Sequence, residues 1–280
     1  MPILKLHACL PLLTYPDANS EIIAPNAAAV AHYLGADLHA LALEADIPPV
    51  SNALSYVLMN LPEMILDAEK LSARRGADLL AAVLAACVAA DVAISTETIR
   101  GHLPVLSDLA AEHARYHDIS LVGWSGGNLG TRMLAEAVVF ASGRPALLFP
   151  EALSEVRLDH VAVAWDASRV AARALADARP LLERASAVTV IMITDEKPLS
   201  TVAGEKLAGH LRELGLPARL QTFRLGERSV ADALQDNATA IGANVLVMGG
   251  FGHSRLRDFV LGGATEGVLA DLKMPVLLSH

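Results

Sequence analysis

The second half of the chain alternates short apolar runs with longer amphipathic segments. The apolar runs are rich in β-branched and aliphatic residues, which predicts strands that are covered on both faces. They lie at 160–165, 188–194, 219–223, 244–248 and 276–278. Helical spacing between them predicts helices at 168–183, 201–214, 229–241 and 262–272. The alternation predicts a doubly wound α/β unit with five parallel strands.

The first half of the chain carries a weaker copy of this pattern. Residues 118–126 align with residues 244–252, and residues 144–149 align with residues 274–279. We therefore expect two tandem doubly wound sheets, each with five parallel strands.

The junction between the copies lies in a polar stretch, residues 151–157. It follows the last strand of the first copy and precedes the first strand of the second, where an interdomain linker is expected. We predict domains at 1–152 and 153–280. The first copy also has an excursion at 44–62, to which the sequence assigns no role.

Glycines after the fourth strand of the second copy are placed for an anion. Gly249 and Gly252 follow this strand, nine residues separate Gly252 from Gly262, and Gly263 comes next. Glycine lets backbone N–H groups approach a ligand without an intervening side chain. A helix start nearby adds unpaired donors and the positive end of the helix dipole. This segment predicts a phosphate or nucleotide site.

Two other phosphate-binding motifs do not fit these residues. No glycine of the segment is followed by Lys-Ser or Lys-Thr, which excludes a Walker-type NTPase. The dinucleotide fingerprint G-x-G-x-x-G begins at Gly250 and Gly252, but Arg255 stands in place of its third glycine. Within the same loop, His253 and Ser254 offer donors to phosphate oxygens.

The glycine spacing resembles that of the universal stress protein family. Its nucleotide-binding members carry G-x-x-G, nine residues, and then Gly followed by Ser or Thr. Gly249, Gly252 and Gly262 match this pattern. Gly263 stands where the family has its hydroxyl residue, and Thr265 lies two residues further on. One phosphate contact of the family is therefore missing or supplied differently.

A second part of the resemblance lies at 160–168, where a predicted strand ends on Asp166 and a helix begins near Ser168. In nucleotide-binding relatives, the acid at this strand end contacts the adenosine. Ligands of doubly wound sheets bind at the carboxyl ends of strands where the strand order reverses, so Asp166 and the Gly249 loop should converge. Asp166 and Ser168 also fit helix capping, which is worth about 1 kcal/mol and is compatible with ligand contact.

The resemblance covers residues 159–280 well and the first half only in outline. It implies the universal-stress-protein-like fold, which is adenine-nucleotide α-hydrolase-like, and a stress-response role. It also implies an adenine nucleotide (ATP, ADP or AMP) as ligand, with or without magnesium. Family members pair through their last strands, so residues 146–149 should lie beside 276–279 in an intramolecular pseudo-dimer, from which a further homodimer can form.

The first copy lacks parts of this site. Gly123 and Gly126 match the first two glycines of the loop, but no glycine pair equivalent to Gly262 and Gly263 follows. Its first strand, at 3–10, runs into Pro11 and not into an acid. We therefore expect the nucleotide in the C-terminal domain.

Charge, cysteine content and the longest apolar run restrict the expected binding partners and the expected cellular compartment. The chain has a net charge of −9, and no run of Lys or Arg offers a local exception, so nucleic acid and anionic lipid surfaces are poor partners. Cys9 and Cys87 lie far apart, which suits a reducing cytoplasm. The longest apolar run, 79–90, falls short of the roughly 20 residues that span a bilayer, and it predicts a buried helix.

Two alternatives remain open besides nucleotide binding. No acid–base pair, metal cluster or activated nucleophile surrounds the glycine loop, so at most slow ATP hydrolysis is expected. The first alternative is a stress or interaction protein whose site is degenerate or holds a different ligand, as Gly263 suggests.

The second alternative is a serine hydrolase. Gly123-Trp124-Ser125-Gly126-Gly127 matches the nucleophile elbow G-x-S-x-G and lies between a predicted strand and helix. Against this interpretation, the repeat aligns Ser125 with Phe251, so the shared loop explains the glycines. An acid and a histidine are also required downstream, for which Asp159 and His253 are the nominal candidates.

Overall fold

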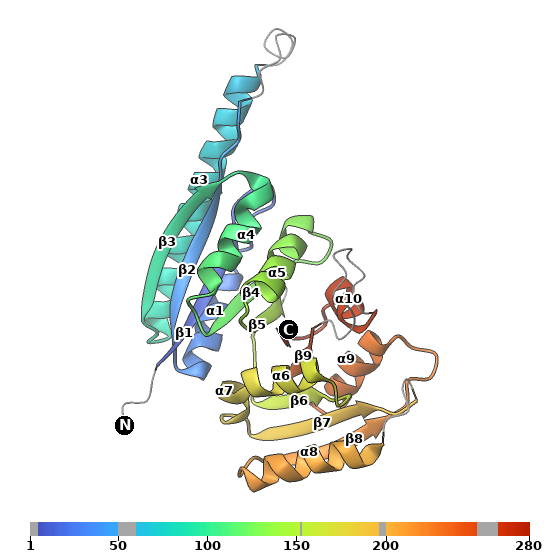
Figure 1. Cartoon of the computed structure of the whole chain (residues 1–280). Coiled ribbons are helices and arrows are strands. Elements are labelled where there is room, and N and C mark those ends of the chain that lie inside the picture. Colours follow the sequence, from blue (N-terminus) through green and yellow to red (C-terminus); the bar gives the residue numbers. More distant parts are fainter. Residues whose placement is uncertain (1–4, 50–59, 152, 196–199, 251–262) are drawn as a thin grey trace. The chain divides into compact units, whose positions relative to one another are not determined.

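The protein forms two compact units, residues 1–142 and 143–280, called here the first and the second unit. Figure 1 shows a computed structural model, which describes residues 5–49, 60–151, 153–195, 200–250 and 263–280. Each unit has a sheet with helices on it, which confirms the predicted α/β class. In the described part of the chain, no helix combines the length and the apolar character needed to cross a membrane.

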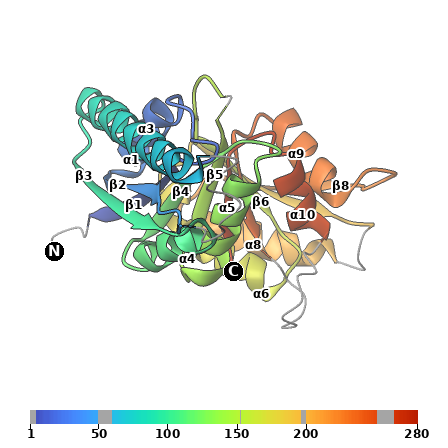
Figure 2. The same ribbon diagram turned by 90° about the horizontal axis from the view of Figure 1, so that it is seen from above.

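The sheet of the first unit has the strand order β3-β2-β1-β4. The elements are β1 (Leu6–Leu13), α1 (Ile23–Leu34), β2 (Ala36–Ala45), α3 (Leu61–Ala89), β3 (Ile94–Gly101), α4 (Leu103–Ala114), β4 (Ile119–Trp124) and α5 (Leu129–Ala141). The pairs β1–β2, β2–β3 and β1–β4 are all parallel. Seen from above, α1 and α3 lie on one face of this sheet and α4 on the other (Figure 2).

The strand predicted at 3–10 extends further than expected. β1 continues through Pro11 to Leu13, and Pro11 pairs with Leu41 of β2. A parallel ladder uses the N–H of alternate residues on each side, so one proline fits without ending the strand. Residues 1–4 lie outside the described part of the chain.

The apolar run at 79–90 is the last part of α3, a helix of 29 residues, and it is not buried all round. Leu79, Val83 and Cys87 face the sheet, whereas Leu84 and Val88 are 47% and 72% exposed. The prediction of a buried helix therefore holds for one stripe only. The first turns of α3 project beyond the sheet (Figure 1), and no residue of 61–71 is buried.

The sheet of the second unit has the strand order β5-β10-β9-β6-β7-β8. The elements are β5 (Ala146–Pro150), β6 (His160–Ala164), α6 (Arg169–Asp177), α7 (Arg179–Leu182), β7 (Ala187–Ile193), α8 (Thr201–Glu213), β8 (Ala218–Phe223), α9 (Val230–Ala240), β9 (Val245–Gly249), α10 (Gly263–Ala270) and β10 (Val276–Ser279). All five predicted strands are present. The single helix predicted at 168–183 is divided in two, because Pro180 at the start of α7 cannot donate to the preceding turn.

β5 pairs antiparallel with β10, and the other strand pairs of the second unit are parallel. Val276 faces Leu148, and Leu278 faces Ala146, which confirms the predicted pairing of the two last strands. This pairing draws β5 into the second unit. The compact units therefore divide at 142/143, ten residues before the boundary placed at 152/153 from the repeat.

Candidate functional site

The strand order of the second unit reverses between β6 and β9. Numbered within the repeat, β8-β7-β6-β9-β10 is the order 3-2-1-4-5 of a doubly wound sheet. Val161 pairs with Val245 and Val163 with Val247, so the carboxyl ends of the two strands lie side by side. Asp166 follows the first of these strands, and Gly249 ends the second.

The turn from β6 to α6 is built around two capping side chains. Asp166 Oδ1 accepts the N–H of Ser168 at 3.0 Å, and Ser168 Oγ accepts the N–H of Ala171 at 3.2 Å. Between them, Ala167 adopts a left-handed conformation with φ of 59°, which costs a non-glycine residue about 1–2 kcal/mol. The capping role expected of Asp166 and Ser168 is present, and it fixes the half-buried carboxyl group at the edge of the sheet.

Gly249 is needed for packing. A Cβ atom at this position would lie 2.5 Å from the carbonyl carbon of Val170 and 2.7 Å from the nitrogen of Ala171. The end of β9 thus touches the first turn of α6, which brings Gly249 close to the Asp166 turn, as the sequence predicted. The close approach of α6 to β9 is therefore a second reason why residue 249 is a glycine. The glycine pattern in the sequence did not reveal this reason.

The helix after the glycine loop, α10, is described from Gly263 onward. Gly263 is exposed, and a Cβ atom there would meet nothing within 4 Å. Thr265, in the first turn of the same helix, is only 3% exposed, so its side chain does not line an open surface. The remaining predicted site residues lie outside the described part of the chain: Gly252, His253, Ser254 and Gly262.

The last residues of β10 anchor the start of the loop, and the sequence analysis missed them. Gly250 donates its N–H to the carbonyl oxygen of Ser279 at 2.7 Å, and His280 Nδ1 lies 3.1 Å from the carbonyl oxygen of Gly250. Ser279 Oγ donates to Asp177 Oδ2 on α6 at 2.5 Å. The available signal was the position of Ser279 and His280 directly after a strand predicted beside β9.

Trp165 places an indole N–H next to this edge. Its Nε1 is buried and has no hydrogen-bond acceptor among the described residues, although buried indole N–H groups usually have one. Its backbone N–H donates to the carbonyl oxygen of Ile191 at 2.9 Å, which holds the residue in line with β7. The sequence analysis did not include Trp165 among the site residues.

The nucleophile elbow finds no support in the geometry. An elbow serine occupies a strained turn, but Ser125 has no positive φ, and its carbonyl oxygen accepts the N–H of Asn128 in an ordinary turn before α5. Asp159, the nominal acid, accepts a hydrogen bond from Asn244 at 2.7 Å, which lowers its pKa. His253 lies outside the described residues, and the described His, Cys, Asp and Glu side chains form no group suited to a metal ion.

The fold and the site geometry define a doubly wound α/β domain with its candidate site at the strand switch point. The model of the universal stress protein family matches residues 157–280. This segment is therefore similar to the universal stress protein family. No curated protein sequence matches the chain.

Solved structures extend the likeness of the fold to both units. A universal stress protein from Archaeoglobus fulgidus DSM 4304 is 17% identical, with a TM-score of 0.71 over 97% of each chain. A putative universal stress protein from Pseudomonas aeruginosa UCBPP-PA14 is 18% identical, with a TM-score of 0.56 over 98% of this chain and 93% of that one. At these identities the likeness concerns the fold.

Proposed function

We propose that this stress-response protein binds an adenine nucleotide, ATP, ADP or AMP, in its second unit. The observation that carries the proposal is the meeting of the Asp166 turn and the end of β9 at the switch point of the sheet. The match of residues 157–280 to the universal stress protein family supports the same ligand class, because the glycine spacing resembles that of the family's nucleotide-binding members. The proposal concerns binding and not catalysis.

Each end of the nucleotide has candidate partners in this arrangement. The Asp166 carboxylate is suited to ribose hydroxyl groups. The phosphates would lie against backbone N–H groups of the glycine loop and the first turn of α10, whose exposed Gly263 leaves room for them. A magnesium ion would bind through the phosphates.

The predicted loop residues complete the proposal. Gly252 and Gly262 belong to it as backbone contacts, and His253 and Ser254 belong to it as side-chain donors. Thr265 contributes less than its sequence position implies, because its side chain is buried in the first turn of α10. Backbone N–H groups at Gly263 take over the role of the family hydroxyl.

Calorimetric titration with ATP, ADP and AMP, with and without magnesium, tests the proposal. Asp166→Asn keeps one oxygen for the N–H of Ser168 but presents an amide to the ribose, so we expect binding to weaken about tenfold or more. Asp159→Asn is the matched control, since Asp159 lies at the other end of β6. In wild type, nucleotide at 100 times its dissociation constant should stabilise the second unit by about 2.7 kcal/mol.

A second candidate is an interaction protein whose site is degenerate or holds a different ligand. The replacement of the family hydroxyl by Gly263 and the burial of Thr265 favour it. The same titration decides between the two. If no nucleotide binds to wild type, or if Asp159→Asn weakens binding as much as Asp166→Asn does, the switch-point nucleotide site is wrong and the second candidate stands.

A further inference from the structure

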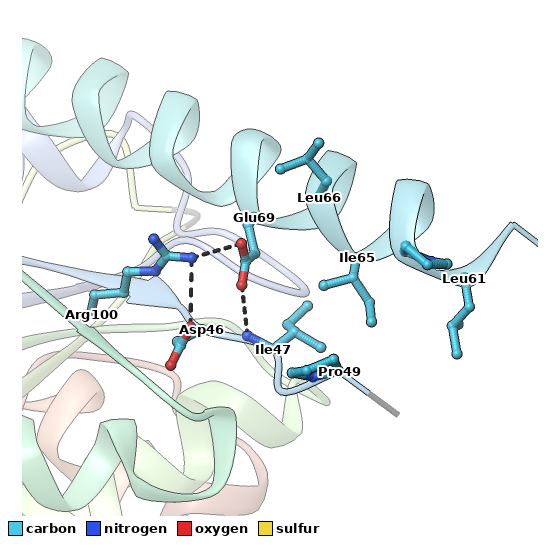
Figure 3. Close-up of a pocket in the computed structure, with 9 residues that line it drawn as sticks. Asp46, Ile47, Pro49, Leu61, Ile65, Leu66, Glu69 and Arg100 are labelled. Carbon is cyan, nitrogen blue, oxygen red and sulfur yellow. Dashed lines mark hydrogen bonds and ion pairs between the residues drawn. The ribbon is translucent and has the colours of Figure 1, made fainter. Parts of the chain in front are cut away.

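A separate cavity lies in the first unit, beneath the first turns of α3 and at the carboxyl ends of β2 and β3. Its volume is about 330 Å³. Ligand pockets usually range from about 300 to 1,000 Å³, so the cavity has room for a small organic molecule. Ile47, Pro49, Leu61 and Ile65 supply an apolar wall, and charged side chains close one end (Figure 3).

The charged end consists of one guanidinium group and two carboxylates. Arg100 Nη2 lies 2.6 Å from Glu69 Oε2 and 3.6 Å from Asp46 Oδ1. The other oxygen of Glu69 accepts the backbone N–H of Ile47 at 2.9 Å. This backbone bond and the bond from Arg100 lower the pKa of Glu69, so its carboxylate is ionised at neutral pH. The three groups together carry one net negative charge.

Because of the orientation of Arg100, the two carboxylates determine the sign of the electrostatic potential in the cavity. Figure 3 shows one terminal nitrogen of the guanidinium directed at Glu69 and Asp46, while the other terminal nitrogen points away from Ile47 and Pro49. Asp46 is 44% exposed, and its 3.6 Å ion pair with Arg100 is longer than a hydrogen bond. Asp46 Oδ1 therefore retains lone pairs for a further donor, whereas Oδ2 lies 3.2 Å from His102 Nε2.

The nearby N-terminus of α3 does not make the cavity favourable for an anion. Helix N-termini attract anions through their free N–H groups. In α3, Pro62 has no N–H to offer, and Glu63 places a negative charge in the first turn. His102 Nε2, 3.2 Å from Asp46 Oδ2, adds a positive charge only when it is protonated.

We propose that this cavity binds a small organic amine. The protonated amino group would lie against Asp46 and Glu69, and its apolar body would lie among Ile47, Pro49, Leu61 and Ile65. A carboxylate or phosphate ligand would meet net repulsion at the charged end, and a purely apolar ligand would leave the free lone pairs of Asp46 unused. The site is independent of the nucleotide proposal and gives a role to part of the excursion at 44–62.

Three probes that share one ring and differ in charge test the proposal on the full chain. Calorimetric titration with phenethylamine, phenethyl alcohol and phenylpropionate should show binding in that order, with roughly threefold to fivefold between amine and alcohol. Asp46→Asn should abolish the advantage of the amine. Asp67→Asn is the matched control, because Asp67 lies on α3, its side chain is 69% exposed and it does not line the cavity.

Substitutions that fill the cavity with a larger side chain test whether the probes bind inside it. Ile65→Trp should abolish binding of all three probes, and Leu61→Trp serves the same purpose if urea unfolding shows that Ile65→Trp is not folded. Three results would overturn the proposal: no binding of any probe to wild type, binding of phenylpropionate as tight as that of phenethylamine, or amine binding that persists in a folded cavity-filled variant.

Discussion

The two units use the same strand order around their first and fourth strands, yet they differ at the switch point. Ala8 pairs with Ile119 in the first unit as Val161 pairs with Val245 in the second. Leu13 lies five residues after Ala8, as Asp166 lies five residues after Val161, so the buried Leu13 corresponds to Asp166. The repeat likewise puts the bulky Trp124 at the position of Gly250. The first unit has apolar side chains where the second has an acid and a glycine.

In the first unit, side chains of α3 also form hydrogen bonds to the residues at the carboxyl ends of β1 and β2, and these bonds cover the edge of the sheet. Thr14 Oγ1 lies 2.7 Å from the carbonyl oxygen of Leu43 and 2.6 Å from Ser72 Oγ, which also accepts the N–H of Ala45. Arg75 donates to the carbonyl oxygen of Pro16 at 2.8 Å. In the second unit, α8 stands at the position of α3. Its Val202 N–H donates to Ser200 Oγ at 3.3 Å, and its Arg212 Nη1 donates to the carbonyl oxygen of Ala218 at 3.2 Å. The same strand order therefore carries an edge sealed by α3 in the first unit and an edge formed by the Asp166 turn and Gly249 in the second.

The largest expected effect concerns the close contact of β9 with α6. Gly249→Ala should destabilise the second unit by about 3 kcal/mol, because the added Cβ collides with backbone that cannot move aside. Urea unfolding measures this, and the two tryptophans of the chain, one in each unit, allow separate signals: Trp124→Phe leaves Trp165 to report on the second unit.

The matched control is Gly126→Ala in the first unit, where a Cβ would meet nothing within 4 Å. It should change the free energy of unfolding by less than about 1 kcal/mol. Equal effects of the two substitutions would show that Gly249 is not held against α6.

A smaller effect is expected from opening the sealed edge of the first unit. Thr14→Val keeps the side-chain shape but removes the hydroxyl shared by Leu43 and Ser72, so the first unit should lose about 2 kcal/mol. Urea unfolding in the Trp165→Phe background, which leaves Trp124 as reporter, measures the loss. Thr194→Val is the control, since Thr194 Oγ1 lies 3.4 Å from its acceptor, and it should cost less than about 0.5 kcal/mol in the second unit. A Thr14 variant as stable as wild type would contradict the sealing role.

The smallest effect is a pH dependence confined to the first unit. Burial lowers the pKa of His117 from 6.5, and the nearby rings of His39, His7 and His113 lower it further. A hydrogen bond with the carbonyl oxygen of His113 raises the pKa but offsets only part of this. The His117 ring stacks on His39 with 5.1 Å between centroids. Since the unfolded chain binds a proton more readily than the folded one, the first unit should lose stability as the pH falls below about 6.5.

His117→Gln removes this contribution. Urea unfolding between about pH 7.5 and pH 5 should show a smaller loss of stability on acidification in the variant than in wild type. His210→Gln, on the exposed surface of the second unit, should leave the slope of the first unit unchanged. Parallel slopes for wild type and His117→Gln would refute the prediction.

The sequence predicted the strands of the second unit because parallel strands covered on both faces appear as continuous apolar runs. It also predicted the Asp166 and Ser168 caps, which depend only on neighbours in the chain. Contacts between distant residues stayed hidden. The packing reason for Gly249 lies in α6, and Thr14 meets Ser72 across 58 positions of sequence. The anchoring of Gly250 by Ser279 needed the same kind of long-range information.

The pairing of β5 with β10 also determines how the chain can be divided for study. A fragment that starts at residue 153, where the repeat begins, would lack β5 and expose the hydrogen-bonding groups of Val276–Ser279 along a free edge. A fragment that starts at residue 143 keeps the strand that covers this edge. The repeat in the sequence and the compact unit in the structure are thus offset, because the second unit includes β5, a strand that belongs to the first copy of the repeat.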